Sequence, residues 1–140
     1  MNTNAAGGFP HVILASASPR RLDLLRQAGI EPEVEPSHVV EVIRSTKPDE
    51  VVMELSRQKA EDIASRHTGE DVVVIGADTV VAFDGNILGK PKDEADAVRM
   101  LHALSGREHR VHTGVCICCG RRAAATVETT IVHFSPIDEA

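Results

Sequence analysis

The residues best suited to bind an anion lie near the N-terminus, in the segment Ser-Ala-Ser-Pro-Arg-Arg of residues 16–21. This segment follows an apolar run, residues 11–15, and begins a helical pattern that extends to Gly29. A helix N-terminus already carries partial positive charge, so two arginines in its first turn are unfavourable unless an anion binds there. Phosphate is the usual anion at such a site. The alternative is that both arginines point into solvent at a small energetic cost.

Two charged residues interrupt apolar patterns elsewhere in the chain. Asp78 lies within the apolar residues 72–83, where a carboxylate that is buried without a partner is costly. It therefore either faces a cation or metal ion in a cleft, or lies in a turn or bulge at residues 76–78. Lys59 shares a helical face with Leu55 and Ile63, so its ammonium either extends into solvent or points into a pocket that holds negative charge.

Two weaker signals are a second carboxylate and a second lysine. Glu41 stands among valines in the extended residues 30–43, and on its own it fits the exposed side of an edge strand. Lys90 precedes Pro91, which fixes the backbone and ends a strand after the turn at Asp84-Gly85.

Composition limits the class of protein. The chain has 140 residues, a net charge of −6 and 2% aromatic residues, which fits one domain and argues against a nucleic-acid binder. No apolar run approaches the ~20 residues of a membrane span. The three cysteines, at 116, 118 and 119, are odd in number and too close to form a disulfide framework, so we expect a cytoplasmic protein. Residues 1–10 are predicted to be a flexible segment.

Strands and helices alternate at first, and strands dominate later. The pattern predicts strands at residues 11–15, 72–75, 79–83, 111–119 and 126–134. It predicts helices at residues 19–29, 48–67 and 93–106, the first begun by Ser18 and the third by Asp93 as N-caps. The predicted fold class is therefore α/β or mixed α+β, with helices packed against a sheet.

Five motifs taken in order resemble the Maf family of nucleoside triphosphate pyrophosphatases, first named for an association with septum formation. They are the residues 14–21, Lys59-Ala60, Gly76-Ala77-Asp78-Thr79, Gly89-Lys90-Pro91 and Leu104-Ser105-Gly106. The resemblance covers nearly the whole chain and implies a single domain over residues 11–140. It also implies an elongated, mixed sheet like that of the inosine triphosphatases, with flanking helices and a cleft between two lobes.

The resemblance further implies hydrolysis of a nucleoside triphosphate to the monophosphate and pyrophosphate by a homodimer that uses Mg²⁺ or Mn²⁺. Arg20 and Thr79 match the subgroup that acts on dTTP and UTP, and we hypothesise that Arg20 donates to a pyrimidine carbonyl. The matching positions assign catalysis to Asp78, Lys59 and Lys90, metal binding to Glu41 and Asp78, and substrate binding to Ser16, Ser18, Arg20, Arg21 and Thr79.

One departure from the family pattern concerns its C-terminal part. The family continues through a segment containing Asp-Lys-Ala-Gly-x-Tyr, whereas this sequence ends at Ala140, so we expect a domain that is incomplete at its C-terminus. The alternative function is a nucleotide-binding regulator of cell division without turnover. A plain interaction domain, which would bind no nucleotide, is a third possibility.

Overall fold

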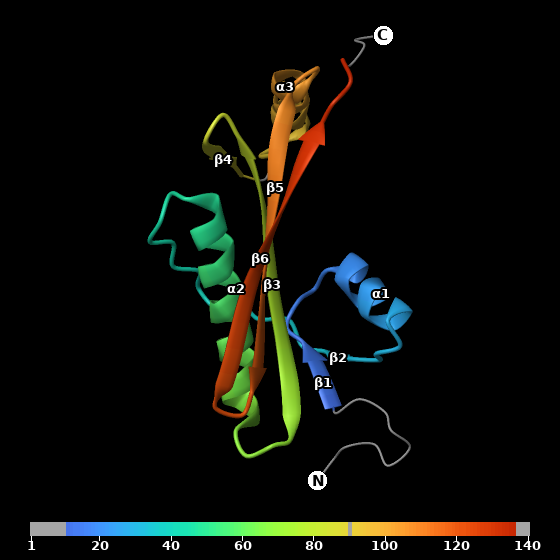
Figure 1. Cartoon of the computed structure of the whole chain (residues 1–140), viewed down its shortest axis with the longest axis vertical. Coiled ribbons are helices and arrows are strands. Elements are labelled where there is room, and N and C mark those ends of the chain that lie inside the picture. The colour runs from blue at the N-terminus through green and yellow to red at the C-terminus, as the bar shows by residue number, and fades with distance from the viewer. Residues whose placement is uncertain (1–10, 90, 137–140) are drawn as a thin grey trace.

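The computed structural model describes residues 11–89 and 91–136 (Figure 1). The predicted flexible segment 1–10 and Lys90 lie outside the described residues. Within them no helix is both long and apolar enough to span a bilayer. In chain order the elements are β1 (His11–Leu14), α1 (Pro19–Gln27), β2 (Glu33–Val34), α2 (Pro48–Ala64), the 3-10 helix η1 (Ser65–His67), β3 (Val72–Phe83), β4 (Asn86–Leu88), α3 (Glu94–Leu104), β5 (Glu108–Cys119) and β6 (Arg122–His133).

The strands form one mixed sheet in the order β2-β1-β3-β5-β6, with β4 paired to β3. β1 runs parallel to β2 and β3, while β3, β5 and β6 form a long antiparallel ribbon. α2 packs against β3 and β5, and α1 lies on the other side of the sheet, beside β1 (Figure 1). The core fills the space between α2 and the sheet with Ile13, Ala60, Ile63, Val74 and Cys116. The predicted mixed α/β class is confirmed.

β3 corrects the prediction of two strands, 72–75 and 79–83, separated by a turn or bulge. Residues Val72–Phe83 form one continuous strand. It pairs residue by residue with β5, from Val73 opposite Cys119 to Ala82 opposite Arg110. A turn would have broken this ladder of hydrogen bonds. Asp78 is therefore a strand residue, and the turn interpretation of it is wrong.

The other differences lie at element ends, where tertiary pairing overrides local preference. β6 begins at Arg122 and not at residue 126, because alanines that favour strands weakly are paired with β5. β5 likewise begins three residues earlier than predicted, at Glu108. α2 ends at Ala64 and is followed by the η1 turn. Of the extended residues 30–43, only the two residues of β2 are paired as a strand.

Two glycines allow the backbone of α2 to lie directly on the sheet. A Cβ atom added at Gly76 would lie 2.5 Å from the carbonyl oxygen of Ser56 and 2.7 Å from the amide nitrogen of Ala60. One added at Gly114 would overlap the carbonyl oxygen of Val52. Because real Cβ atoms do not approach backbone so closely, both positions require glycine for packing and not for turn geometry.

We predict that Gly114→Ala lowers the free energy of unfolding by about 1–3 kcal/mol, because α2 must move away from the sheet to accommodate the methyl group. Urea denaturation measures the effect. Gly89→Ala is the matched control, since a Cβ atom there meets nothing within 4 Å. Equal losses of stability in both variants would contradict the close approach of α2.

A histidine fastens the end of α2 to the segment after β2. His67 Nε2 lies 2.7 Å from Glu35 Oε1, and His67 Nδ1 lies 3.0 Å from Glu70 Oε2. Hydrogen bonds to Glu35, the larger cause, and to Glu70 raise the pKa of His67 above its ordinary value, because both carboxylates favour the charged ring. The two contacts therefore stabilise the fold most when His67 is protonated.

We predict that this contribution is complete below pH ~6.5, the ordinary pKa of histidine, and is lost as the pH rises through the raised pKa of the folded state. Stability is lost as the pH rises because the folded state binds the proton of His67 more tightly than the unfolded state does. Urea unfolding of the parent and of His67→Gln across a pH series measures the difference. A difference in stability that grows as the pH rises would contradict the assignment.

Candidate functional site

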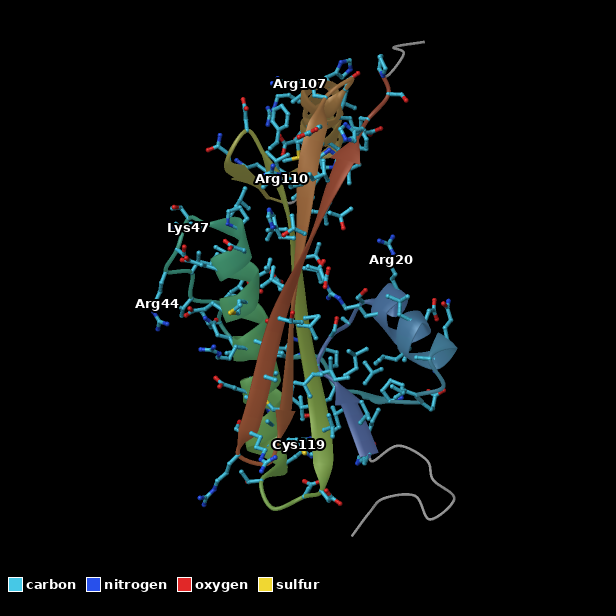
Figure 2. All side chains as sticks on the ribbon, viewed as in Figure 1. Arg20, Arg44, Lys47, Arg107, Arg110 and Cys119 are labelled. Carbon is cyan, nitrogen blue, oxygen red and sulfur yellow. The ribbon has the colours of Figure 1, made fainter. Side chains whose placement is uncertain are left out.

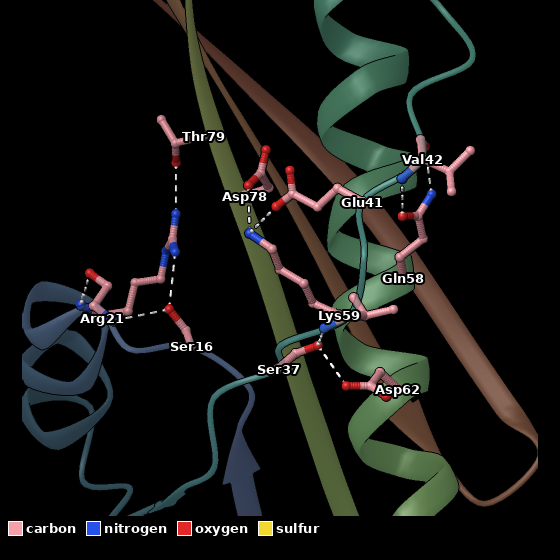
Figure 3. A network of polar contacts seen from close by, with 12 residues as sticks. Ser16, Arg21, Ser37, Glu41, Val42, Gln58, Lys59, Asp62, Asp78 and Thr79 are labelled. Carbon is pink, nitrogen blue, oxygen red and sulfur yellow. Dashed lines mark hydrogen bonds and ion pairs between the residues drawn. The ribbon is translucent and has the colours of Figure 1, made fainter. Parts of the chain in front are cut away.

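The candidate site lies beside the end of β1, where one edge of β3 is not paired with another described strand. β1 pairs with residues 72–75 of β3, and β4 pairs with residues 81–83, while β5 takes the other edge throughout. In the described part of the chain, residues 76–80 therefore have no strand partner on this edge. Asp78 and Thr79 lie in this gap, and successive side chains on a strand point to opposite faces. Asp78 faces α2 and Thr79 faces α1 (Figure 3).

Lys59 joins two carboxylates from different segments. Its Nζ atom lies 2.7 Å from Asp78 Oδ1 and 3.5 Å from Glu41 Oε1. The side chain of Asp78 is 14% exposed and that of Lys59 is 21% exposed, which makes this a shielded ion pair. Of the two predicted orientations of Lys59, into solvent or toward negative charge, the structure shows the second. Both carboxylates belong to the protein itself.

Arg21 forms a second group on the opposite face of β3. Its Nη2 atom donates to Thr79 Oγ1 at 2.9 Å, and its Nη1 atom donates to Ser16 Oγ at 3.1 Å. Thr79 Oγ1 and Thr113 Oγ1 share a hydrogen bond of 3.0 Å. Burial lowers the pKa of Arg21 from its ordinary value, and the nearby charge of Asp78 opposes that shift. The guanidinium remains charged at neutral pH, because arginine gives up its proton only in strong base.

The start of α1 brings the serines to the same place. Ser18 is the N-cap and accepts from the backbone N–H of Arg21, as predicted. Ser16 Oγ accepts from the backbone N–H of Ser18 at 3.2 Å. The first turn of α1 contains no acidic residue, so nothing in that turn offsets the positive end of the helix or its arginines.

Arg20 and Lys90 are not brought into this arrangement. Arg20 extends from the start of α1 into solvent and makes no hydrogen bond or ion pair with any other residue that the structure describes (Figure 2). Of the two arginines, the structure therefore engages only Arg21. Lys90 lies outside the described residues, so its role stays a prediction.

Glu41 and Asp78 were predicted as metal ligands. They converge on Lys59, yet among residues 11–89 and 91–136 no group of three or more His, Cys, Asp or Glu side chains is placed to hold a metal ion. Two carboxylates still suit Mg²⁺, which commonly takes one or two of them together with phosphate oxygens and water. The donor set therefore fits a metal that arrives with a phosphorylated ligand.

Sequence reasoning missed two residues of this network. Thr113 lies directly opposite Thr79 in the β3–β5 register, so knowledge of that register would have found it. Gln58 binds the backbone of Val42, and nothing in the local pattern of α2 indicates this contact. The predicted cleft between two lobes stays a prediction. A cavity of about 540 Å³ lies elsewhere, lined in part by Lys47 at the start of α2 and Arg110 of β5.

We predict that Lys59 and Asp78 are coupled by about 1 kcal/mol or more in a double-mutant cycle of Lys59→Met and Asp78→Asn, measured by urea unfolding. The pair is largely shielded from water, so solvent screens it little. Arg26 and Glu31 form the matched control, because their 3.1 Å ion pair has side chains 52% and 70% exposed. Coupling no larger than that of this exposed pair would contradict the prediction.

Two solved structures resemble this fold. A nucleoside-triphosphatase / dITP/XTP pyrophosphatase from Mycobacterium abscessus superposes with a TM-score of 0.56 at 16% identity, covering 88% of this chain and 73% of that one. The Ham1 protein of Staphylococcus aureus gives a TM-score of 0.57 at 15% identity, with 88% and 71% covered. At such low identity the likeness concerns the fold alone.

Curated relatives are much more similar in sequence. The chain is 53% identical over 128 residues to a dTTP/UTP pyrophosphatase of Agathobacter rectalis, covering 84% of this chain and 62% of the relative. It is 46% identical over 129 residues to the protein of the same name from Koribacter versatilis, with 91% and 66% covered. The chain thus spans less than two thirds of the length of these relatives.

The family model described as Maf-like protein matches residues 11–140. This match includes every element of the sheet and all the residues of the network around Asp78. The chain belongs to the Maf family.

Proposed function

We propose that this chain provides the phosphate-binding and catalytic residues of a nucleoside triphosphate pyrophosphatase that hydrolyses dTTP or UTP to the monophosphate and pyrophosphate. The observation that carries the proposal is the arrangement on β3, where Asp78 pairs with Lys59 on one face and the adjacent Thr79 accepts from Arg21 on the other. The relatives named dTTP/UTP pyrophosphatase support the same substrates.

Charge complementarity supports a triphosphate as the ligand. The chain as a whole carries a net charge of −6, so an anion needs a local concentration of positive charge. Arg21 supplies one cation, and the N-terminus of α1, whose first turn has no acidic residue, adds a partial positive charge. Lys59 is offset by Asp78 and Glu41, and it contributes its charge only where a bound divalent cation takes over part of their contact. In this proposal Lys90 contributes a further cation. The hydroxyls of Ser16 and Ser18 accept hydrogen bonds in the structure, and each also donates its own hydrogen to a phosphate oxygen.

The proposed chemistry uses the two oxygens of Asp78 differently. Oδ1 accepts from Lys59, which holds the carboxylate in one orientation. Among the described residues Oδ2 accepts no hydrogen bond, so it is available to take a proton from water. The oxygen of that water then bonds to the α-phosphorus, the bond to the bridging oxygen breaks, and pyrophosphate leaves with the electron pair. Arg21 and Lys59 stabilise the charge that develops on the phosphate oxygens.

A divalent cation, Mg²⁺ or Mn²⁺, is part of the proposal. Asp78 and Glu41 would hold it, with Lys59 giving up part of its contact with them. A bound cation neutralises phosphate charge and lowers the pKa of water. The two carboxylates of this chain would orient the cation, while Arg21, which donates to Thr79 on the opposite face of β3, would bind phosphate oxygens.

The choice of base, the compartment and the assembly belong to the same proposal. Arg20 is free of protein partners in the described residues, which leaves its guanidinium available for a pyrimidine carbonyl. Cys116, Cys118 and Cys119 are free thiols, which supports a reducing, cytoplasmic location. The homodimer expected from the resemblance stays a prediction.

A screen for pyrophosphate release over dTTP, UTP, CTP and purine triphosphates with Mg²⁺ tests the proposal. We expect release from dTTP and UTP, and we expect Asp78→Asn to lower the rate by about 10² or more, because the amide cannot accept the proton of water. Circular dichroism checks that the variant is folded.

Asp84→Asn is the matched control, because it makes the same substitution in the exposed turn that ends β3, where Asp84 has a φ of 55° that asparagine also adopts. Its rate is expected to equal that of the parent. Normal pyrophosphate release by Asp78→Asn would remove Asp78 from the chemistry. Nucleotide binding without product in any reaction would favour the regulator of cell division.

A further inference from the structure

Residues 36–46 have no regular secondary structure in the part of the chain before α2, yet they are fixed along that helix. Three side chains of α2 hold them. Asp62 accepts from the hydroxyl of Ser37, Gln58 binds the backbone of Val42, and Glu54 accepts from Arg44. Glu54, Gln58 and Asp62 are four residues apart and therefore form one stripe on the helix surface. We call residues 36–46 the strap.

Apolar burial contributes little to holding the strap, because only Val39 among its valines and isoleucine is partly buried. Its side chains Val40, Val42 and Ile43 are 83%, 45% and 60% exposed. Segments with so little buried apolar area depend on specific polar contacts for their position. The hydrogen bonds from α2 therefore determine where the strap lies.

Gln58 makes the most specific of these contacts. Its Oε1 atom accepts from the N–H of Val42 at 3.0 Å, and its Nε2 atom donates to the carbonyl oxygen of Val42 at 2.8 Å. One side-chain amide thus satisfies both polar groups of one peptide residue. Nε2 also donates to Glu54 Oε1 at 3.4 Å, which fixes which end of the amide carries the oxygen.

Glu41 directly precedes Val42 in the strap. Its carboxylate lies 3.5 Å from Lys59 Nζ, and its side chain is 45% exposed. Lys59 follows Gln58 on α2, so the helix residue that holds the strap adjoins the residue that receives the carboxylate (Figure 3). We propose that Gln58 is a positioning residue that sets Glu41 against Lys59 and thereby sets the second carboxylate of the site. This inference rests on the proposed function.

Hydrogen exchange on the free protein tests the hold of Gln58 on the strap. Gln58→Met keeps the length of the side chain but removes both hydrogen bonds, so we expect the amide of Val42 to exchange roughly fivefold faster or more. Arg57→Met is the matched control, because Arg57 is an exposed neighbour on α2 that makes no hydrogen bond with another described residue. Its effect on exchange at Val42 is expected to be negligible.

A double-mutant cycle tests whether Gln58 acts through Glu41. We expect Gln58→Met to lower kcat/KM for dTTP roughly 10-fold or more, as loss of a residue that orients a site ligand typically does. In a Glu41→Gln background the same change is expected to alter kcat/KM by less than about twofold, because no carboxylate remains to be positioned. The same cycle is run on the dissociation constant for α,β-imido-dUTP, which needs no turnover.

The outcomes separate this inference from the proposed function. Equal exchange at Val42 in the parent and in Gln58→Met overturns the inference whatever the enzyme does. Effects of Gln58→Met that are the same size with and without Glu41 also overturn it. A parent protein that neither hydrolyses dTTP nor binds the imido analogue overturns the proposed function, and exchange at Val42 still decides whether Gln58 holds the strap.

Discussion

The contact between the backbone of α2 and the sheet at Gly76 and Gly114 is the constraint on which the site depends. A lysine side chain is long, but its ammonium reaches a strand carboxylate at 2.7 Å only if the helix axis is close enough. Glycine at both positions permits that approach, because any side chain would separate the two layers. The ion pair between Lys59 and Asp78 is thus a consequence of backbone packing. This ion pair also explains why the carboxylate of Asp78 is tolerated within an apolar strand.

A second constraint is the arrangement of strands around β3. β1 is only four residues long and β4 only three, so within residues 11–89 and 91–136 no strand pairs with the middle of one edge of β3. The start of α1 reaches this gap directly from the end of β1. The gap is bordered by Ser16 and Arg21 on one face and by Lys59 and Glu41 on the other. Short strands beside a long one therefore create the place where distant segments meet.

Much of this arrangement could be predicted from residues that conflict with their surroundings. Asp78 and Lys59 each break an apolar pattern, and the structure pairs them. The continuity of β3 could not be predicted, because it depends on residue-by-residue pairing with β5. The sequence also cannot distinguish Arg20 from Arg21, since only the direction of α1 decides which one faces Thr79. Gln58 was missed because a polar residue on an exposed helix face looks the same whether or not it binds a backbone.

The uncovered stretch of β3 has a consequence for the solubility of the protein. Unpaired N–H and C=O groups on a strand edge invite a strand from another molecule to add to the sheet. A ligand that contacts both Thr79 and Asp78 has to straddle this edge, since their side chains leave the strand on opposite sides. Such a ligand would block the addition of a foreign strand sterically. A ligand bound there would therefore also oppose edge-to-edge association at residues 76–80.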